Sequence, residues 1–195
     1  MYNMSGIPNK MLPVAVEMLP EGYRRLEYLE STGTQCIDTG RLWAARDEVS
    51  ILYEVTKSPN YNIFGAGTYR MAATTSASEG VYFCLPEKYT FTSVRDMVKT
   101  SAYYSFTELR VNEYSRAINI ADFVSLANIF VFGNAANGLY PAHMRLYSFQ
   151  HKKPNGDNMC LIPALDPTGR PCMFDTVSHT PFYNATTTGP DFLYG

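Results

Sequence analysis

The residues that could do chemistry in this 195-residue chain are its carboxylates, histidines and cysteines, and their spacing limits what they can do. Glycoside hydrolysis needs two carboxylates that flank the scissile bond at separations of about 5 to 9.5 Å. On a strand, such acids would stand two or four positions apart on one face. The nearest acidic pairs are Glu27 with Glu30, Asp47 with Glu48, and Glu108 with Glu113. None has this spacing, so we expect solvated surface charges here and no hydrolase site.

Nucleophilic catalysis is not indicated either. It requires a serine or cysteine beside a base, yet the histidines His143, His151 and His179 stand singly, without an acidic or cysteine partner at a recognisable spacing. The chain also lacks a G-x-S-x-G motif. We therefore do not expect an enzyme.

The four cysteines are Cys36, Cys84, Cys160 and Cys172, and they form no C-x-x-C pair. No histidine stands at metal-ligand spacing from them, so the sequence predicts no metal site of this kind. We expect reduced, mostly buried thiols, with one disulfide as the alternative. A bridge from Cys160 to Cys172 is disfavoured, because counting outward from the turn at residues 166–169 places Cys172 nearer Pro163.

The composition excludes several classes of protein. The chain carries 16 Lys and Arg against 18 Asp and Glu, a net charge of -2, so it lacks the basic excess of an electrostatic nucleic-acid binder. Charged residues make up only 17%, whereas 15 Tyr and 11 Phe bring the aromatic fraction to 14%. No apolar run approaches the ~18 residues of a membrane span. The first ten residues lack the pattern of a secretory signal, so we expect either no Sec export or a signal outside this sequence.

The elements that must position these residues follow a period of two. Residues 49–55 and 81–85 alternate apolar with more polar side chains, as half-buried strands do. Residues 101–111 form another strand region, followed by a hairpin turn at Asn112-Glu113. A short helical turn capped by Asp122 is expected at residues 120–126. Further strands are expected at residues 24–30, 35–39, 114–120, 129–132, 144–149, 159–164 and 172–175. Many short strands without a long amphipathic helix predict an all-β fold, a two-sheet antiparallel β-sandwich.

Residues 1–20 differ from the sandwich domain expected over residues 21–195. Prolines 8, 13 and 20 prevent a stable helix and favour an extended arm. The candidate partner-docking residues in this arm are Met4, Met11, Val14 and Met18. Methionine side chains are adaptable and suit a contact with another subunit. The alternative is a strap that lies on the domain's own core.

Several blocks of sequence together resemble one family. They are residues 19–40 (LPEGYRRLEYLESTGTQCIDTG), 128–138 (NIFVFGNAANG), 142–150 (AHMRLYSFQ) and 161–175 (LIPALDPTGRPCMFD), with the closing Gly195. In this order they resemble the concanavalin A-like, laminin-G-like jelly-roll domains found in phage structural and gut-bacterial surface proteins. Departures are Cys36, where the family usually has an aromatic residue, and residues 151–159, which replace a regular strand-turn-strand.

The resemblance implies a jelly roll whose first and last strands share one sheet, so residues 26–39 should meet residues 182–193. We expect no cofactor. The resemblance leaves calcium as an alternative, because such folds sometimes hold this ion at one rim. The candidates for that alternative are Asp38, Asn134, Asn137 and Asp157, which form no carboxylate-rich loop.

Binding is the chemistry that remains. Neutral sugars are recognised by stacking on exposed aromatic rings and by hydrogen bonds from neutral polar groups. The candidate ligand-binding residues are the loop aromatics Trp43, Tyr61 and Tyr69, each of which could instead fill an edge of the sandwich.

The leading hypothesis is a non-catalytic structural or binding module of a phage virion: a decoration, fibre or receptor-binding protein. Its partners would be other virion proteins, or a second copy bound through the arm, and its outward loops could contact cell-surface glycans. The alternative is a carbohydrate-binding module at the bacterial surface or outside the cell. A glycoside hydrolase is the least favoured reading.

Overall fold

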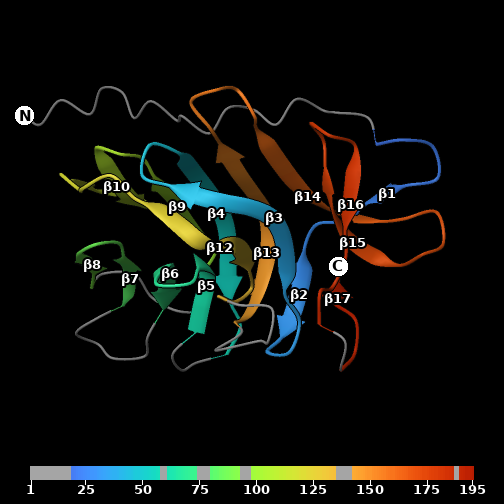
Figure 1. The fold of residues 1–195 in the computed structure, drawn as a ribbon. Coiled ribbons are helices and arrows are strands. Elements are labelled where there is room, and N and C mark those ends of the chain that lie inside the picture. Colours follow the sequence, from blue (N-terminus) through green and yellow to red (C-terminus); the bar gives the residue numbers. More distant parts are fainter. Residues whose placement is uncertain (1–18, 58–60, 74–79, 93–97, 135–141, 187–188) are drawn as a thin grey trace, which may run out of the picture.

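The computed structural model describes residues 19–57, 61–73, 80–92, 98–134, 142–186 and 189–195. These residues form strands, turns and irregular segments, and none of them is helical (Figure 1). The strands are β1 (Arg24–Arg25), β2 (Leu29–Thr32), β3 (Ile37–Ala44), β4 (Glu48–Val55), β5 (Tyr61–Ala66), β6 (Tyr69–Ala73), β7 (Val81–Cys84), β8 (Lys88–Phe91), β9 (Thr100–Tyr104), β10 (Glu108–Val111), β11 (Tyr114–Ala117), β12 (Val124–Val131), β13 (His143–Lys152), β14 (Met159–Leu165), β15 (Pro171–Asp175), β16 (Thr180–Phe182) and β17 (Leu193–Tyr194).

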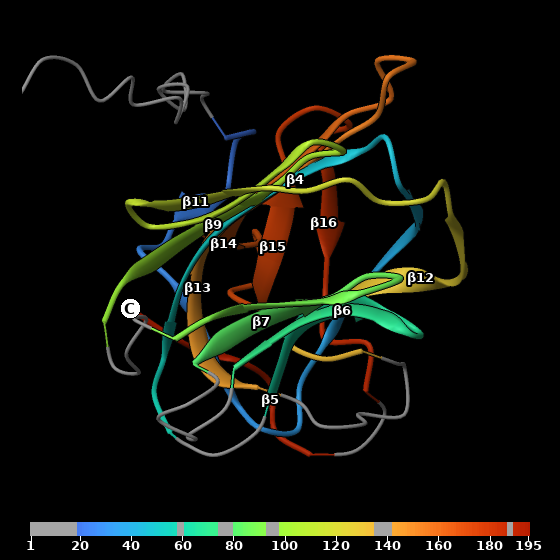
Figure 2. The ribbon, with the colours of Figure 1, turned by 90° about the vertical axis from the view of Figure 1, so that its left-hand side faces the viewer.

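The strands build two layers. The larger sheet has 11 strands, with the central order β11-β10-β9-β4-β13-β14-β15-β16, while β1 pairs with β14 and β2 pairs with β13 and β17. The smaller sheet has six strands in the order β3-β12-β5-β6-β7-β8. All pairs of named strands are antiparallel, and Figure 2 shows β9 and β11 in one layer facing β6 and β7 in the other. The fold is therefore the all-β, two-sheet antiparallel sandwich that the sequence predicts.

Strict alternation decides which side chains lie between the layers. In β4 the buried residues are Val49, Ile51, Tyr53 and Val55, and the intervening side chains face outward. Strand β7 repeats the pattern, with Val81 and Phe83 buried. Because successive side chains of a strand point to opposite faces, a period of two produces one buried and one outward face per sheet. Both predicted alternating strands are confirmed.

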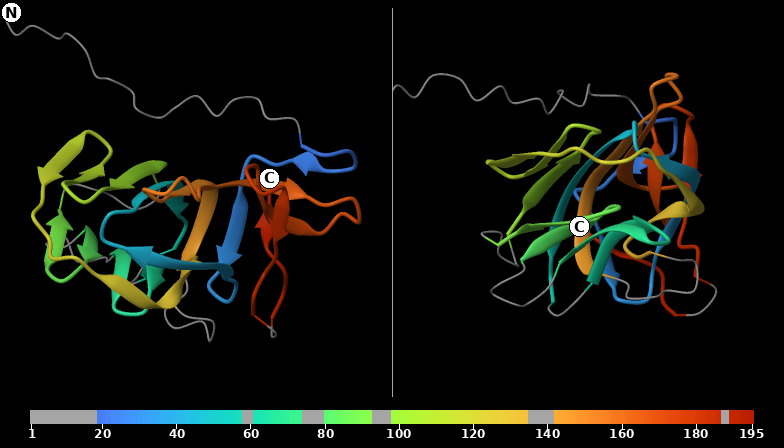
Figure 3. Two further views of the ribbon diagram at one scale, coloured as in Figure 1. Left: turned by 45° about the horizontal axis from the view of Figure 1, so that its top comes forward. Right: turned by 60° about the vertical axis from the view of Figure 1, so that its left-hand side comes forward.

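The two ends of the sandwich domain meet in the larger sheet. Strand β17 pairs with β2, with Leu193 opposite Glu30. The Gln35 side-chain amide donates to the backbone oxygens of Pro190 (3.1 Å) and Asp191 (3.3 Å). Figure 3 shows the C-terminus close to the blue segment that begins the described chain. The expected contact between residues 26–39 and 182–193 is confirmed.

Local expectations had mixed outcomes. The turn at Asn112-Glu113 joins β10 to β11, and Asn112 adopts a φ of 52°, which asparagine tolerates better than most residues. The expected helical turn at residues 120–126 is wrong. Residues 118–123 are irregular, and β12 begins at Val124. Pairing of β12 with β3 supplies inter-strand hydrogen bonds that override the local signal from Asp122.

The first described residue, Leu19, packs outside the main core. A small apolar cluster on β14 and β15 consists of Ile162, Ala164, Cys172 and Phe174, and Leu19, Tyr23 and Tyr183 cover it. This packing resembles the strap alternative for the last residues of the arm. The candidate docking residues Met4, Met11, Val14 and Met18 lie outside the described residues.

All four cysteines are free: Cys36 and Cys172 are buried, while Cys84 and Cys160 are half-buried.

The turn between β14 and β15 is closed around one carboxylate. Asp166 accepts hydrogen bonds from the Thr168 amide (2.8 Å) and hydroxyl (2.7 Å), the Arg170 amide (3.0 Å) and the Tyr183 hydroxyl (2.8 Å). These bonds, that from the Thr168 hydroxyl foremost, hold the pKa of Asp166 far below its usual range. Arg170 also pairs with Asp191 at 3.0 Å. Asp166 therefore serves the turn as an ionised acceptor.

Candidate binding surface

The structure corrects the expectation that Trp43 lies at the surface. Its side chain is completely buried, with its ring centroid 5.0 Å from that of Tyr104, 5.2 Å from Phe64 and 6.0 Å from Phe123. Trp43 lies within β3 rather than in a loop, at an inward position of the alternation. A ring in this position fills the core and presents no stacking face to solvent.

The other two candidate aromatics are half-buried and do not lie together as one site. Tyr61 packs its ring edge-on to His143, with 5.2 Å between centroids. Tyr69 stacks on Phe123 at 4.0 Å with an interplanar angle of 23°. Both rings pack against the main core. Each therefore already uses a ring face or edge inside the protein.

A buried acid–histidine pair is the feature that the sequence did not reveal. His151 Nε2 lies 2.8 Å from Asp47 Oδ2, and both side chains are almost fully buried. The same Asp47 oxygen accepts the Ala44 amide at 2.8 Å. The expectations that Asp47 is a solvated charge and that His151 stands alone are wrong. The two residues are 104 positions apart, and only the pairing of His151 with Val49, between β13 and β4, brings them together.

This pair does not extend to a nucleophile. Among the described residues, His151 Nδ1 is buried and has no hydrogen-bond partner. In a serine or cysteine triad, the second ring nitrogen would contact the nucleophile's hydroxyl or thiol. The pair instead links the Ala44–Asp47 turn to β13.

Other carboxylates are likewise occupied by protein donors. Asp175 accepts the amides of Cys160 (2.8 Å) and Val177 (3.1 Å) and the hydroxyl of Ser178 (2.6 Å). Asp38 accepts the Gly40 amide at 2.8 Å and the Asn128 side-chain amide at 3.0 Å. Both carboxylates therefore serve as hydrogen-bond acceptors for neighbouring strands and turns.

The calcium candidates are spread over separate contacts. Asp157 pairs with Arg41 at 2.9 Å. The Asn134 amide donates to the Gly67 carbonyl. Asn137 lies outside the described residues. Within the described part of the chain, no three acids, histidines or cysteines come together as metal ligands.

The middle of the outward face of the larger sheet carries neutral polar side chains, with charged residues such as Arg110 at its edges. Across four strands, the register aligns Arg110 with Tyr103, Tyr103 with Ser50, and Ser50 with Gln150. The next outward row aligns Ser101 with Leu52 and Leu52 with Ser148. We call the set Ser50, Ser101, Tyr103, Ser148 and Gln150 the serine–glutamine face. All five are half-buried, as expected for side chains that stand side by side on a sheet.

Several hydrogen-bonding groups on this face are free. The side chains of Ser50, Ser148 and Gln150 have no hydrogen-bond partner among the described residues, whereas the Ser101 hydroxyl lies 3.5 Å from the Asn112 side-chain oxygen. Burial raises the pKa of Tyr103, whose hydroxyl also interacts with the Ser105 hydroxyl and the Glu48 carboxylate. The Arg110 guanidinium lies 5.6 Å from the Tyr103 ring centroid. The face therefore offers uncharged donors and acceptors beside one aromatic ring.

A bulge in β13 borders the serine–glutamine face. The pairing with β4 skips Tyr147, whose hydroxyl donates to Glu54 at 2.8 Å. Lys99 Nζ lies 3.6 Å from the Tyr147 ring centroid. Burial, followed by the bond to Glu54, raises the pKa of Tyr147 to about 12. Arg145 bonds Glu30 at 2.8 Å in the same outward row, so this border is charged and internally paired.

Comparison with known proteins adds no family to this geometry: no protein-family profile and no curated protein matches the chain. Among the described residues, no helix has the length and apolar character needed to span a membrane.

Proposed function

We propose that this chain is a non-catalytic jelly-roll module that binds neutral glycans through the serine–glutamine face. The observation that carries the proposal is the row Tyr103, Ser50 and Gln150 across adjacent strands, with a serine and an amide free to bond a ligand. Sugars present hydroxyl groups along a flat ring, and neutral amide and hydroxyl side chains match them without the cost of burying a charge.

The hydrogen bonds that four aspartates accept from the protein support binding without cleavage. Asp38, Asp166 and Asp175 each accept at least two hydrogen bonds from the protein, and Asp47 is committed to His151 and Ala44. A glycosidase needs one carboxyl group that can carry a proton to the leaving oxygen. Because these four acids hold protein donors, we assign the proton-donor role to none of them.

The setting we propose is a phage virion, where the module would be a decoration, fibre or receptor-binding component. This part rests on the resemblance of residues 19–40, 128–138, 142–150 and 161–175 to jelly rolls of phage and gut-bacterial surface proteins. A bacterial surface or secreted carbohydrate-binding module would use the same face. Capsid and tail genes beside this gene would support the virion setting, and polysaccharide-utilisation genes would support the alternative.

A glycan array tests the binding proposal directly. We expect the full chain to retain neutral oligosaccharides, and we expect Gln150→Ala and Ser50→Ala each to weaken retention about three- to tenfold. The matched control is Thr90→Ala, which removes a half-buried hydroxyl on β8 in the smaller sheet. Absence of any retained glycan would refute the proposal and favour a purely architectural role. A control variant that loses as much glycan retention as Gln150→Ala and Ser50→Ala would also refute the proposal.

The same oligosaccharides test the absence of catalysis. After prolonged incubation with the protein, we expect their chain lengths to remain unchanged by mass spectrometry. Shortened products that disappear when the protein is heat-denatured would show a hydrolase and would overturn the non-catalytic part of the proposal.

The role of the arm has its own test. Removal of residues 1–18 leaves Leu19 on its apolar cluster, so we expect the unfolding midpoint of the sandwich to stay unchanged. If the arm docks the module, this truncation abolishes association with the particle or with a second copy. Unchanged association would refute the docking role.

A further inference from the structure

One apolar side chain lies in the middle of the serine–glutamine face. Leu52 points outward from β4 and is half-buried, between the outward residues Ser50 and Glu54 of the same strand. The register places Ser101 of β9 on one side of Leu52 and Ser148 of β13 on the other. Because neighbouring strands are about 4.8 Å apart, a small group that rests on Leu52 is within reach of both serine side chains.

The other members of the face extend this polar border around Leu52. Gln150 stands two residues beyond Ser148 on β13, and Tyr103 stands two residues beyond Ser101 on β9, so both are diagonal neighbours of the leucine. Diagonal positions on a sheet are about 7 to 8 Å apart, a distance that long side chains can bridge. The leucine is therefore an aliphatic point bordered on three sides by hydroxyl and amide groups.

The groups around Leu52 differ in their capacity to bond a ligand. The Ser148 hydroxyl and the Gln150 amide have no hydrogen-bond partner among the described residues. On the fourth side, Glu54 accepts the Tyr147 hydroxyl at 2.8 Å and lies 3.7 Å from Arg145 Nη1. A ligand that touches the leucine thus meets free neutral groups on one side and a carboxylate already bonded within the protein on the other.

The chemical group that matches this arrangement is a methyl group attached to an amide. A methyl group that covers the exposed part of Leu52 removes apolar surface from water, which is favourable. An amide beside it has one N–H donor and one carbonyl acceptor, and a serine hydroxyl can pair with either. The acetamido group of an N-acetylhexosamine combines the methyl, the donor and the acceptor, and it carries no charge.

Two other classes of neutral sugar match less well. An unsubstituted hexose places a hydroxyl against the leucine, and a hydroxyl buried without a hydrogen bond is unfavourable. A 6-deoxy sugar has a methyl group, but this group is attached directly to the sugar ring, so no amide lies between Ser101 and Ser148. The acetamido group is the one that uses the leucine and both serines together.

We propose that the serine–glutamine face selects N-acetylated hexosamines and that Leu52 receives the methyl group of the acetamido substituent. Ser101 and Ser148 pair with its amide, while Ser50 and Gln150 bind hydroxyl groups of the sugar. This inference rests on the proposed glycan binding and adds the class of sugar that the face prefers.

Two oligosaccharides that differ only in the acetamido group test the selection. Calorimetric titration of the full chain compares the N-acetylglucosamine trimer of chitin with the glucose trimer of cellulose, and a glycan array extends the comparison to other linkages. We expect the acetylated trimer to bind about tenfold more tightly, because a contact of methyl size changes affinity by this order. If glycans bind but no acetylated sugar binds more tightly than its counterpart, or if a 6-deoxy sugar binds most tightly, this inference alone is overturned. If no glycan binds at all, the proposed function fails and the inference fails with it.

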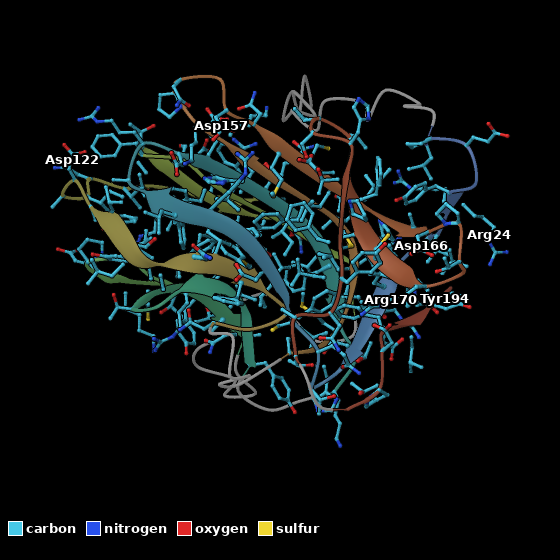
Figure 4. The ribbon with its side chains drawn as sticks, turned by 45° about the vertical axis from the view of Figure 1, so that its right-hand side comes forward. Arg24, Asp122, Asp157, Asp166, Arg170 and Tyr194 are labelled. Atoms are coloured by element: carbon cyan, nitrogen blue, oxygen red, sulfur yellow. The ribbon has the colours of Figure 1, made fainter. Side chains whose placement is uncertain are left out.

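Substitutions test the assigned contact through the ratio of the two trimers' dissociation constants. Leu52→Ala should bring this ratio from about ten toward one. Ser148→Ala leaves the leucine in place and should lower the ratio about threefold. The matched control is Leu42→Ala, at a leucine that is 42% exposed on β3 of the smaller sheet, which runs beside β12 in Figure 4. A ratio that stays near ten in Leu52→Ala, or that falls as far in the control, would overturn the inference.

Discussion

The outward faces of the two sheets differ in how strand register determines which side chains they expose. On the larger sheet, the row Tyr103, Ser50 and Gln150 lies where β9 pairs with β4 without a shift and where residues 148–152 of β13 pair regularly with β4. On the smaller sheet, Leu126 is exposed because register is broken between β12 and β3. A regular ladder spreads neutral polar groups over a flat area, whereas a bulge concentrates an apolar projection at one point. The glycan binding that we propose belongs to the first arrangement.

The largest expected effect concerns the buried pair of Asp47 and His151, which joins the turn before β4 to β13. Asp47→Ala leaves His151 Nε2 and the Ala44 amide without their acceptor in a buried site. We expect a loss of about 3 kcal/mol in the free energy of unfolding, measured by urea denaturation. The control Asp122→Ala removes an exposed acid that pairs with Arg46 and should cost less than ~1 kcal/mol. Equal losses in the two variants would show that the buried pair contributes no special support.

The next effect concerns the bulge in β12, which Ser125 fixes through two hydrogen bonds. Ser125→Ala removes the acceptor of the buried Trp43 amide and the donor to the Ala127 carbonyl. We expect a loss of about 1 to 2 kcal/mol in unfolding free energy. Hydrogen exchange at Trp43 should accelerate, while exchange at Ser50 in the larger sheet stays unchanged. Unaltered exchange at Trp43 would contradict the assignment of Ser125 as the residue that fixes the bulge.

A smaller effect at alkaline pH belongs to the border of the serine–glutamine face. The pKa of Tyr147 is raised to about 12, above the ~10 of an unfolded tyrosine. Its contribution to stability is therefore complete below pH ~10 and is lost as the pH rises toward 12. We expect Tyr147→Phe to reduce the dependence of stability on pH over this interval. The measurement is a spectrophotometric titration of the tyrosines. If the variant and the wild type show the same number of tyrosines ionising near pH 12, the assignment is contradicted.

The smallest expected effect on folding is at the centre of the serine–glutamine face. Gln150→Ala removes a side chain without a hydrogen-bond partner among the described residues, so the unfolding free energy should change by less than ~0.5 kcal/mol. Glycan retention should nevertheless fall. A large loss of stability would mean that Gln150 supports the sheet, and the contrast between the two faces would then disappear.

Much of the fold could be predicted from particular patterns. The alternation of Val49, Ile51, Tyr53 and Val55 defined the inward side of β4, because a strand's side chains have a period of two. The turn at Asn112-Glu113 was predicted for a similar local reason. The irregular segment before Val124 was not, because pairing between distant strands outweighed a local helical signal.

The functional surfaces were less accessible to sequence reasoning. The loop assignment of Trp43 ignored its inward place in β3. The partner of His151 lies 104 residues away, and no local spacing could indicate it. The serine–glutamine face likewise draws its members from strands far apart in the chain, so only their register reveals the row.

The sequence alone determined that this chain builds a low-charge, two-layer β-sandwich, because period-two patterning and turn residues act over a few neighbouring positions. Tertiary structure decided which residues meet: Asp47 with His151, Ser50 with Gln150, and the bulge that exposes Leu126. These contacts depend on the register between strands that are distant in sequence, and register is fixed only when the sheets close around a common core.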